Sequence, residues 1–205
     1  MESVIIVPDY APASNIRVYG LADSIRRAKF PMSVDTDSLT DALTPGIEAL
    51  AQSRPGSGHD QWLTGVIVQF DLTFSNKAWT EMQRYHFIDF VSSQSTMHRI
   101  TRFDLRKQYN EYVDPDIVQI MVDKVNVYNA MRDEWDDATA AQKYLEILYS
   151  NPAGFMLKAG MTTNYRQLKT IYAQRRNHRL PEWRRFCGFV EYLPESQLIT
   201  TRGEL

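Results

Sequence analysis

The segment from Thr64 to Phe74 constrains the fold most strongly, because its side chains alternate strictly between two faces. The positions that point one way are all apolar: Val66, Val68, Phe70, Leu72 and Phe74. The positions that point the other way include Gln69, Asp71 and Thr73. Alternation with a period of two is typical of a β-strand that is buried on one face. We therefore predict a strand over Thr64–Phe74, and a second, short buried strand over Val4–Val7.

Helical patterns fill most of the remaining chain. We predict helices over Leu21–Ala28, Ser38–Gln52, Ala78–Val91, Pro115–Trp135, Thr139–Tyr149, Thr163–Arg176 and Pro181–Tyr192. The second of these begins with a capping-box pattern at Ser38, and the last has proline at a first-turn position. Ser53–Gly58 is the clearest loop, and residues 193–205 are predicted to form a tail. Since helices outnumber strands, we predict a single mixed α/β domain over residues 1–205, with a strand order that the pattern does not give.

The bulk properties exclude several classes of protein. The chain has 205 residues and a net charge of −2, so any affinity for phosphate must come from local clusters of charge. Cys187 is the only cysteine, which rules out an intrachain disulfide and fits a reducing cytosol. The N-terminal segment has no basic leader, and no stretch approaches the ~20 apolar residues that a membrane span needs. We expect a cytoplasmic protein that contacts no membrane, in a cell or in a phage-infected host.

Positive charge collects in two segments. From Arg84 to Lys107, seven Arg, Lys and His residues stand against two aspartates. From Arg166 to Arg185, eight such residues stand against Glu182 alone. The second excess is hard to explain as a balanced, solvated helix face, because almost nothing in the segment offsets it.

Spacing in the second segment points to an anionic or polar ligand. On a helix, Asn164, Leu168, Ile171 and Arg175 form one row of i+3 and i+4 steps, so an amide and a guanidinium lie on a mostly apolar stripe. A guanidinium on a buried face needs a partner, and arginine is suited to bidentate contacts with phosphate or a pyrimidine edge. The alternative is an ion pair with a carboxylate of another helix. Spacing alone favours this alternative, since structural ion pairs are common.

The segment Ser92–Arg99 is the other unusual run. Four small hydroxyl residues at the end of a predicted apolar helix lead directly into His98 and Arg99. Such a run can hold a phosphate or a sugar through its backbone amides and hydroxyls. A plain helix terminus, capped by serine and threonine, explains the same residues, and taken alone it is the better explanation.

Two other kinds of site are disfavoured. Cys187 falls on an apolar helical face with Trp183 and Phe186, so we interpret it as a buried structural thiol and not as a nucleophile. We expect no metal site, because the four histidines share no ligand spacing and no cysteine cluster accompanies them. These histidines are His59, His86, His98 and His178.

A nucleic-acid-binding protein is a further alternative. The basic helix also carries Tyr165, Tyr172 and, further on, Trp183, and interleaved aromatic and basic residues can bind single strands. The same aromatic residues fit positions that face a core, and no recognisable nucleic-acid-binding module is present. We therefore rank this alternative lower.

Taken together, the two basic segments resemble the flavin-dependent thymidylate synthases, the ThyX family. Asn164, Arg166, Leu168 and Arg175 match the family's Asn-x-Arg-x-Leu helix and the arginine nine residues beyond its first arginine. The run 83–87, Gln-Arg-Tyr-His-Phe, resembles the family's glutamine followed by an Arg-His-Arg triplet. With His86 placed on the family's histidine, Ser95 falls on the second serine of the motif.

Two turns extend the resemblance over roughly residues 58 to 190. Gly58-His59 resembles the family's Gly-His turn, and Pro152 lies where the family has Leu-Pro. The sequence also departs from the pattern. The triplet's arginines are replaced by Tyr85 and Phe87, the motif's Asn-Glu by Ser92-Ser93 and its final arginine by Met97. Leu148 stands at the phosphate-contacting arginine, and Gly65 stands near the position of the histidine implicated in catalysis.

The resemblance implies a helix-rich fold with a small central sheet, and a homotetramer that binds FAD where subunits meet. It implies reductive methylation of dUMP, with methylenetetrahydrofolate as carbon donor and NADPH as reductant of the flavin. This reaction needs a cation to stabilise charge that develops on the pyrimidine, and Arg175 matches the arginine with that role. The flavin-side positions matched are Arg84, His86, Asn164, Arg166, Thr170 and His178. The nucleotide-side candidates are Gln83, Ser93, Ser95, Arg99 and Arg175.

The departures keep one alternative open within the resemblance. A relative that binds flavin and nucleotide could make a different 5-substituted pyrimidine, since the phosphate-contacting arginines are replaced. A catalytically silent interaction protein ranks below that alternative.

Overall fold

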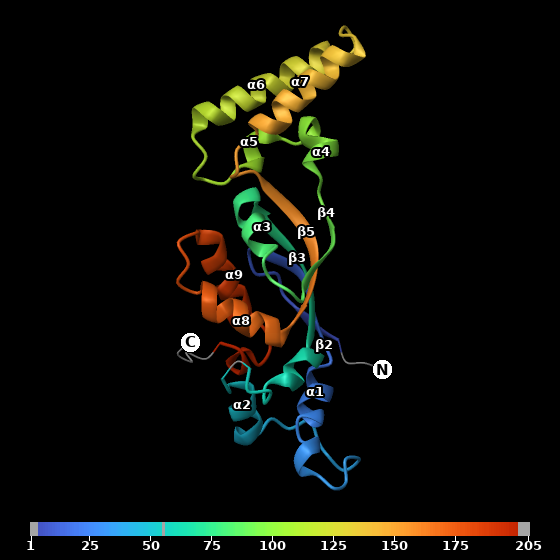
Figure 1. The fold of residues 1–205 in the computed structure, drawn as a ribbon, viewed down its shortest axis with the longest axis vertical. Coiled ribbons are helices and arrows are strands. Elements are labelled where there is room, and N and C mark those ends of the chain that lie inside the picture. The colour runs from blue at the N-terminus through green and yellow to red at the C-terminus, as the bar shows by residue number, and fades with distance from the viewer. Residues whose placement is uncertain (1–3, 55, 201–205) are drawn as a thin grey trace. The chain divides into compact units, whose positions relative to one another are not determined.

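The computed structural model describes residues 4–54 and 56–200. It contains one five-stranded sheet with the order β1-β2-β3-β5-β4 (Figure 1). The strands are β1 (Ile5–Val7), β2 (Ala13–Tyr19), β3 (Ile67–Ser75), β4 (Ile88–Ser93) and β5 (Met156–Asn164). The α-helices are α1 (Leu21–Arg27), α2 (Pro45–Ala51), α3 (Asn76–Met82), α4 (Thr96–Arg99), α5 (Leu105–Gln108), α6 (Pro115–Met131), α7 (Asp137–Ser150), α8 (Tyr165–Arg175) and α9 (Pro181–Tyr192). The protein therefore has a helix-rich mixed α/β fold with a small sheet, as predicted.

The chain divides into two compact units. The first comprises residues 1–72, 83–92 and 159–205, and the second comprises residues 73–82 and 93–158. Short 3₁₀ helices complete the elements: η1 (Phe30–Met32), η2 (Gln61–Gly65) and η4 (Ser196–Leu198) in the first unit, and η3 (Ile100–Arg102) in the second.

The first unit buries the apolar face of its strands under two helices. Val68, Phe70 and Leu72 of β3 are buried, as their alternation predicts. The ring of Phe70 lies 4.9 Å from that of Phe189, which belongs to α9, and α8 packs beside α9 (Figure 1). Helix α9 begins at Pro181 and ends at Tyr192, in agreement with the prediction.

The second unit has a core of its own. It is made by Ile100, Leu105, Met121, Val125, Ile147 and Phe155. Helices α6 and α7 run side by side over this core (Figure 1). Met121 and Val125 of α6 point inward, whereas Ile117 and Met131, which the apolar pattern of this helix also predicts to face inward, are exposed. Helix α6 ends at Met131, four residues before its predicted end at Trp135.

The predicted helix over Ser38–Gln52 is wrong in its first half. Helix α2 begins only at Pro45, and Thr44 caps it by accepting a hydrogen bond from the backbone N–H of Ile47 at 3.4 Å. Proline disfavours the helical conformation in the residue before it, so Pro45 sets the start of the helix. The preceding segment is held instead by Lys29, whose Nζ donates to the backbone oxygens of Thr40 and Ala42.

The predicted helix from Ala78 to Val91 is also wrong beyond Met82. Helix α3 ends at Met82, and residues 88–93 form strand β4. Phe87 has a φ of +60°, which a continuing helix does not permit. Its backbone oxygen accepts a hydrogen bond of 2.7 Å from the hydroxyl of Thr163 on β5. The helical spacing of His86, Phe87, Phe90 and Val91 therefore does not describe a buried face, and all four side chains are exposed.

Besides β4, strands β2 and β5 were not predicted from sequence. In β2 the buried positions are Ala13, Ile16 and Val18, and the register shifts between Ser14 and Arg17, which breaks the alternation. In β5 the buried positions are Ala159, Met161 and Thr163, and only Met161 among them is large and apolar, so the pattern is weak. Because β5 continues to Asn164, helix α8 begins at Tyr165 and not at Thr163.

The C-terminal segment differs from the predicted tail. Leu193, Leu198 and Ile199 are buried, so residues 193–200 pack against the rest of the first unit. Residues 201–205 lie outside the described part of the chain. Within residues 4–54 and 56–200, no helix is both long enough and apolar enough to cross a membrane.

Candidate flavin and nucleotide site

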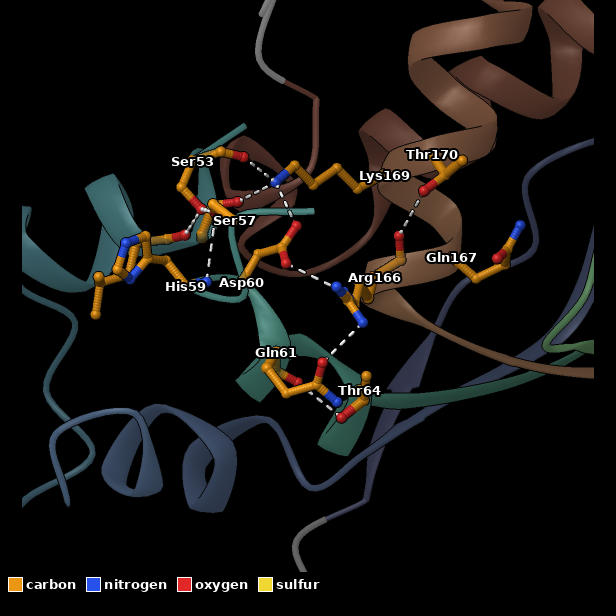
Figure 2. Close-up of polar contacts among 12 residues, drawn as sticks. Ser53, Ser57, His59, Asp60, Gln61, Thr64, Arg166, Gln167, Lys169 and Thr170 are labelled. Atoms are coloured by element: carbon orange, nitrogen blue, oxygen red, sulfur yellow. Dashed lines mark hydrogen bonds and ion pairs between the residues drawn. The ribbon is translucent and has the colours of Figure 1, made fainter. Parts of the chain in front are cut away.

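A cavity of about 490 Å³ lies in the first unit, beside the first turns of helix α8. It is lined by Gly56, Asp60, Gln61, Thr64, Phe87, Asn164, Arg166, Gln167 and Thr170. Most of its polar groups come from two elements, helix α8 and the 3₁₀ helix η2 with the loop before it (Figure 2). The cavity thus brings together Asn164, Arg166 and Thr170, which were all predicted as flavin-side residues.

The Asn-x-Arg-x-Leu motif has a clear physical basis in this helix. Asn164 caps α8, since its Oδ1 accepts a hydrogen bond of 2.9 Å from the backbone N–H of Gln167. Leu168, one turn further on, is fully buried in the core. Arg166 lies on the other side of the helix, at the cavity. The spacing of the motif therefore fixes the start of the helix, anchors it in the core and directs a guanidinium to the cavity.

A buried carboxylate, Asp60, holds two cations of α8 at the cavity wall. Its Oδ1 accepts a hydrogen bond of 3.1 Å from Nε of Arg166, and its Oδ2 accepts one of 2.8 Å from Nζ of Lys169 (Figure 2). The Asp60 side chain is only 3% exposed and that of Lys169 only 10%. Buried charges are tolerated when they are paired and hydrogen-bonded, and here both conditions are met.

Each cation has further partners. Nη1 of Arg166 donates to Oε1 of Gln61 at 2.7 Å. Nζ of Lys169 donates to the backbone oxygens of Ala51 and Ser53, each at 2.7 Å. Lys169 therefore ties α8 to the end of α2, while Arg166 is held in one orientation at the cavity.

The lining is suited to a planar heterocycle with amide-like edges. Gln61, Asn164 and Gln167 carry amides that can donate and accept, and Thr64 and Thr170 carry hydroxyls. Phe87 is 70% exposed and offers an apolar surface at the same cavity. The first turn of α8 adds the partial positive charge of a helix N-terminus. A volume of about 490 Å³ falls within the usual range for small-molecule sites, and the donor and acceptor set fits the ring system of a flavin.

Arg175 lies in a second polar cluster, at the other end of α8. Its Nε donates a hydrogen bond of 2.7 Å to the hydroxyl of Tyr85. Its guanidinium carbon lies 4.7 Å from the centre of the Trp183 ring and 5.4 Å from that of Tyr85. His178 packs edge-on against Trp183, with ring centres 6.3 Å apart. Arg175 and His178 are thus together, outside the lining of the cavity beside the first turns of α8.

The remaining predicted residues lie at exposed or separate positions. Gln83, Arg84 and His86 are exposed on the turn that precedes β4. Ser93, Ser95 and Arg99 belong to the second unit, where Ser95 precedes the first residue of α4. The predicted residues on and directly after α8 therefore lie in two clusters. The roles of the other six predicted residues stay predictions.

The polar lining residues that were not predicted from sequence are Asp60, Gln61, Thr64 and Gln167. Lys169 was recognised only as part of the basic excess, although it lies three residues after Arg166 and so within reach of the same partner. The one available signal for Asp60 was its place directly after the Gly58-His59 turn. The excess positive charge of α8 is partly offset by Asp60, 106 positions earlier in the chain than Arg166.

Cys187 is a buried thiol, as predicted. It is 3% exposed in α9. Burial raises the pKa of the thiol to about 12; the nearby Glu191 carboxylate also raises it, whereas Arg176 and Arg175 lower it. A thiol with this pKa stays protonated at neutral pH, so Cys187 is not an activated nucleophile.

The aromatic residues that favoured nucleic-acid binding face the core. Tyr165 and Trp183 are fully buried, and Tyr172 is 8% exposed. Stacking on bases requires exposed ring faces. These three rings therefore do not form a surface for single-stranded nucleic acid.

No sequence-family profile matches this chain, and no curated protein matches it by sequence. Its fold resembles that of flavin-dependent thymidylate synthase ThyX from Helicobacter pylori, solved in complex with FAD and dUMP. That structure gives a TM-score of 0.64 at 14% identity and covers 97% of each chain. A second Helicobacter pylori ThyX structure with FAD and dUMP gives 0.63 at 14% identity, and covers 97% of this chain and 96% of the other. The chain thus has the ThyX fold over nearly its whole length.

Proposed function

We propose that this protein is a flavin-dependent enzyme of the thymidylate synthase kind, which acts on a pyrimidine nucleotide. The proposed reaction is the reductive methylation of dUMP to dTMP, with FAD as cofactor and methylenetetrahydrofolate and NADPH as co-substrates. The observation that carries the proposal is the cavity lined by Asn164, Arg166 and Thr170, in a chain that has the ThyX fold. The family resemblance, which rests on sequence alone, assigns the same three residues to the flavin side.

The cavity residues would hold the flavin ring. Arg166, fixed by Asp60 and Gln61, would donate to the ring, and Gln167 and Thr170 would supply further hydrogen bonds. When bound, the flavin would supply the hydride for the reduction. The same proposal places Arg84, His86 and His178 at other parts of the cofactor, within a homotetramer whose sites lie where subunits meet.

The nucleotide side rests on Arg175. A fixed cation beside the pyrimidine stabilises negative charge that develops on the ring, which lowers the barrier without a protein nucleophile. Cys187 cannot serve as that nucleophile, because it is buried and protonated. Gln83, Ser93, Ser95 and Arg99 are proposed as further contacts to the nucleotide.

A second candidate function is the modification of a different pyrimidine nucleotide. Gly65 stands near the position of the family's catalytic histidine, and an added Cβ there would lie 2.5 Å from the hydroxyl of Ser24, a buried residue. The oxygen of Gly65 would also lie 2.7 Å from a Cβ added at Gly20. This close packing favours glycine at both positions. The protein therefore has no side chain near the position of the family's catalytic histidine. This difference supports a reaction other than dUMP methylation on the same fold.

The visible absorption spectrum tests the proposal most directly. We expect purified protein to be yellow, or to take up added FAD with quenching of the flavin fluorescence. With reduced flavin bound under anaerobic conditions, addition of dUMP and methylenetetrahydrofolate should reoxidise the flavin and yield dTMP. Reoxidation by another pyrimidine nucleotide and not by dUMP would favour the second candidate. A colourless protein that does not bind FAD would contradict both.

A further inference from the structure

The phenol of Tyr85 is arranged to accept a hydrogen bond from Arg175. Its oxygen lies 2.7 Å from Nε of Arg175 and 2.9 Å from Oε1 of Gln174. An amide oxygen can only accept, so the Tyr85 proton points to Gln174. The lone pairs of the phenol then remain for Arg175, and the direction of this hydrogen bond is set.

Two aromatic rings fix the plane of the same guanidinium. Trp183 and Tyr85 lie edge-on to each other with ring centres 5.8 Å apart, and both lie within cation–π distance of Arg175. Trp183 is fully buried in the core of the first unit, so it is a rigid support. A long side chain that is held by a hydrogen bond and a ring loses little further freedom when it binds a ligand.

Tyr85 also changes the local charge. It stands where the resemblance places the first arginine of the triplet. A second guanidinium beside Arg175 would repel it, whereas tyrosine supplies an acceptor and an aromatic face. Compared with the arginine of the family pattern, Tyr85 thus removes one positive charge and adds a contact that orients Arg175.

We propose that Tyr85 is a positioning residue that holds Arg175 in the orientation required by the pyrimidine nucleotide. This inference rests on the proposed function, because it needs a nucleotide at Arg175. It predicts that the phenol oxygen contributes to nucleotide affinity without itself touching the nucleotide.

The test compares Tyr85→Phe with the wild type. The variant keeps the ring but loses the oxygen. We expect the affinity for dUMP, measured by calorimetry on the FAD-loaded protein, to fall roughly tenfold, as for the loss of one hydrogen bond from a charged group. FAD affinity should be unchanged. Tyr85→Arg should weaken dUMP binding at least as much, because it restores the like charge.

Tyr172→Phe is the matched control. Tyr172 lies on the same helix and donates a single hydrogen bond of 2.6 Å to Glu191. The control therefore also loses one phenol hydroxyl from a tyrosine. We expect it to bind dUMP as the wild type does. Equal dUMP affinity in Tyr85→Phe and the wild type would overturn the proposal, and so would an equal loss in Tyr172→Phe.

A second measurement separates this proposal from the proposed function. The Nε–H of Arg175, assigned by its absence in Arg175→Lys, should give a slowly exchanging NMR signal in the wild type and a fast one in Tyr85→Phe. If the wild type binds no dUMP, the proposed function fails, and with it the nucleotide role of this pair. The signal would still decide whether Tyr85 orders Arg175, and an unchanged exchange rate would overturn that part as well.

Discussion

Lys169 and Asp60 form a buried ion pair, with 2.8 Å between Nζ and Oδ2. The pair joins helix α8 to the loop before η2, and the other oxygen of Asp60 orients Arg166 at the cavity. One carboxylate thus serves both the packing of the first unit and the geometry of its site. The two effects can be separated by experiment, because stability and ligand affinity are measured independently.

Asp60→Asn should destabilise the protein strongly. The change removes the negative charge but leaves Lys169 buried, with only the oxygens of Ala51 and Ser53 as strong partners. Breaking a buried pair on one side typically costs about 3 kcal/mol or more. Urea denaturation at neutral pH should show this loss of unfolding free energy. FAD affinity should fall as well, because the single amide oxygen of asparagine cannot replace both carboxylate oxygens, which accept from Lys169 and Arg166, and the charge that held Arg166 is lost.

Asp104→Asn is the control for this prediction. Oδ2 of Asp104 lies 3.0 Å from Nζ of Lys107, a distance like that in the buried pair, but both side chains are largely exposed. Exposed pairs contribute little to stability. The same substitution should therefore leave the denaturation midpoint unchanged, and similar losses in both variants would rule out burial as the cause.

Arg166→Ala should lower FAD affinity at least tenfold. The guanidinium is the one cationic group in the cavity lining, as far as residues 4–54 and 56–200 are concerned. A hydrogen bond to a charged group is worth about 1.5 kcal/mol or more, which corresponds to roughly a tenfold change. Arg179→Ala serves as control, since Arg179 is exposed and outside the lining. Fluorescence titration would contradict the prediction if both variants lost affinity equally.

The part of the site carried by one helix could be predicted from sequence. Arg166 and Leu168 point in nearly opposite directions on any helix, so their spacing separates a cavity group from a core residue. The capping role of Asn164 was not predicted, because the helix was expected to begin at Thr163. Asp60 could not be predicted, because nothing local to it indicates a partner 106 positions away. Periodicity in a sequence is a property of one element, whereas this ion pair depends on how two elements pack.

The same limit explains the error over β4. Phe87, Phe90 and Val91 fit a helical stripe, yet Phe90 and Val91 belong to β4, an edge strand of the sheet, and Phe87 directly precedes it. Its conformation depends on its neighbour β5, which the sequence pattern did not reveal, and on the positive φ of Phe87. Strand pairing is set by distant residues, so a local pattern can favour the wrong element.

Ser95→Ala should weaken nucleotide binding without loss of stability. Ser95 precedes helix α4, but its side chain makes no capping hydrogen bond, so its removal should cost the fold little. Thr44→Ala is the opposite case, because Thr44 does cap α2 and its removal should cost about 1 kcal/mol. Calorimetry with dUMP and thermal unfolding of both variants would check this. Equal dUMP affinity in Ser95→Ala and the wild type would remove Ser95 from the site.

Alkaline pH should destabilise the protein through its buried acids. Burial raises the pKa of the Cys187 thiol from about 9 to about 12, and raises those of Tyr109 and Tyr172 from about 10 to about 12. At a pH between the ordinary pKa of a group and its raised pKa in the folded protein, the unfolded chain loses a proton that the folded chain keeps. This difference favours unfolding. The stabilising contribution is complete below about pH 9 and is lost as the pH rises to about 12. Urea denaturation at several pH values should show a steady fall over this range.

Cys187→Ala isolates the contribution of the thiol to this fall. The variant should be less stable than the wild type at pH 7, because it leaves space in the core. The difference should shrink as the pH rises above about 9, since only the wild type has a thiol that must stay protonated to remain folded. The tyrosines still titrate in the variant, so its stability declines too, but with a smaller slope. Parallel stability curves for the two proteins would mean that the buried thiol does not hold its proton as the structure indicates.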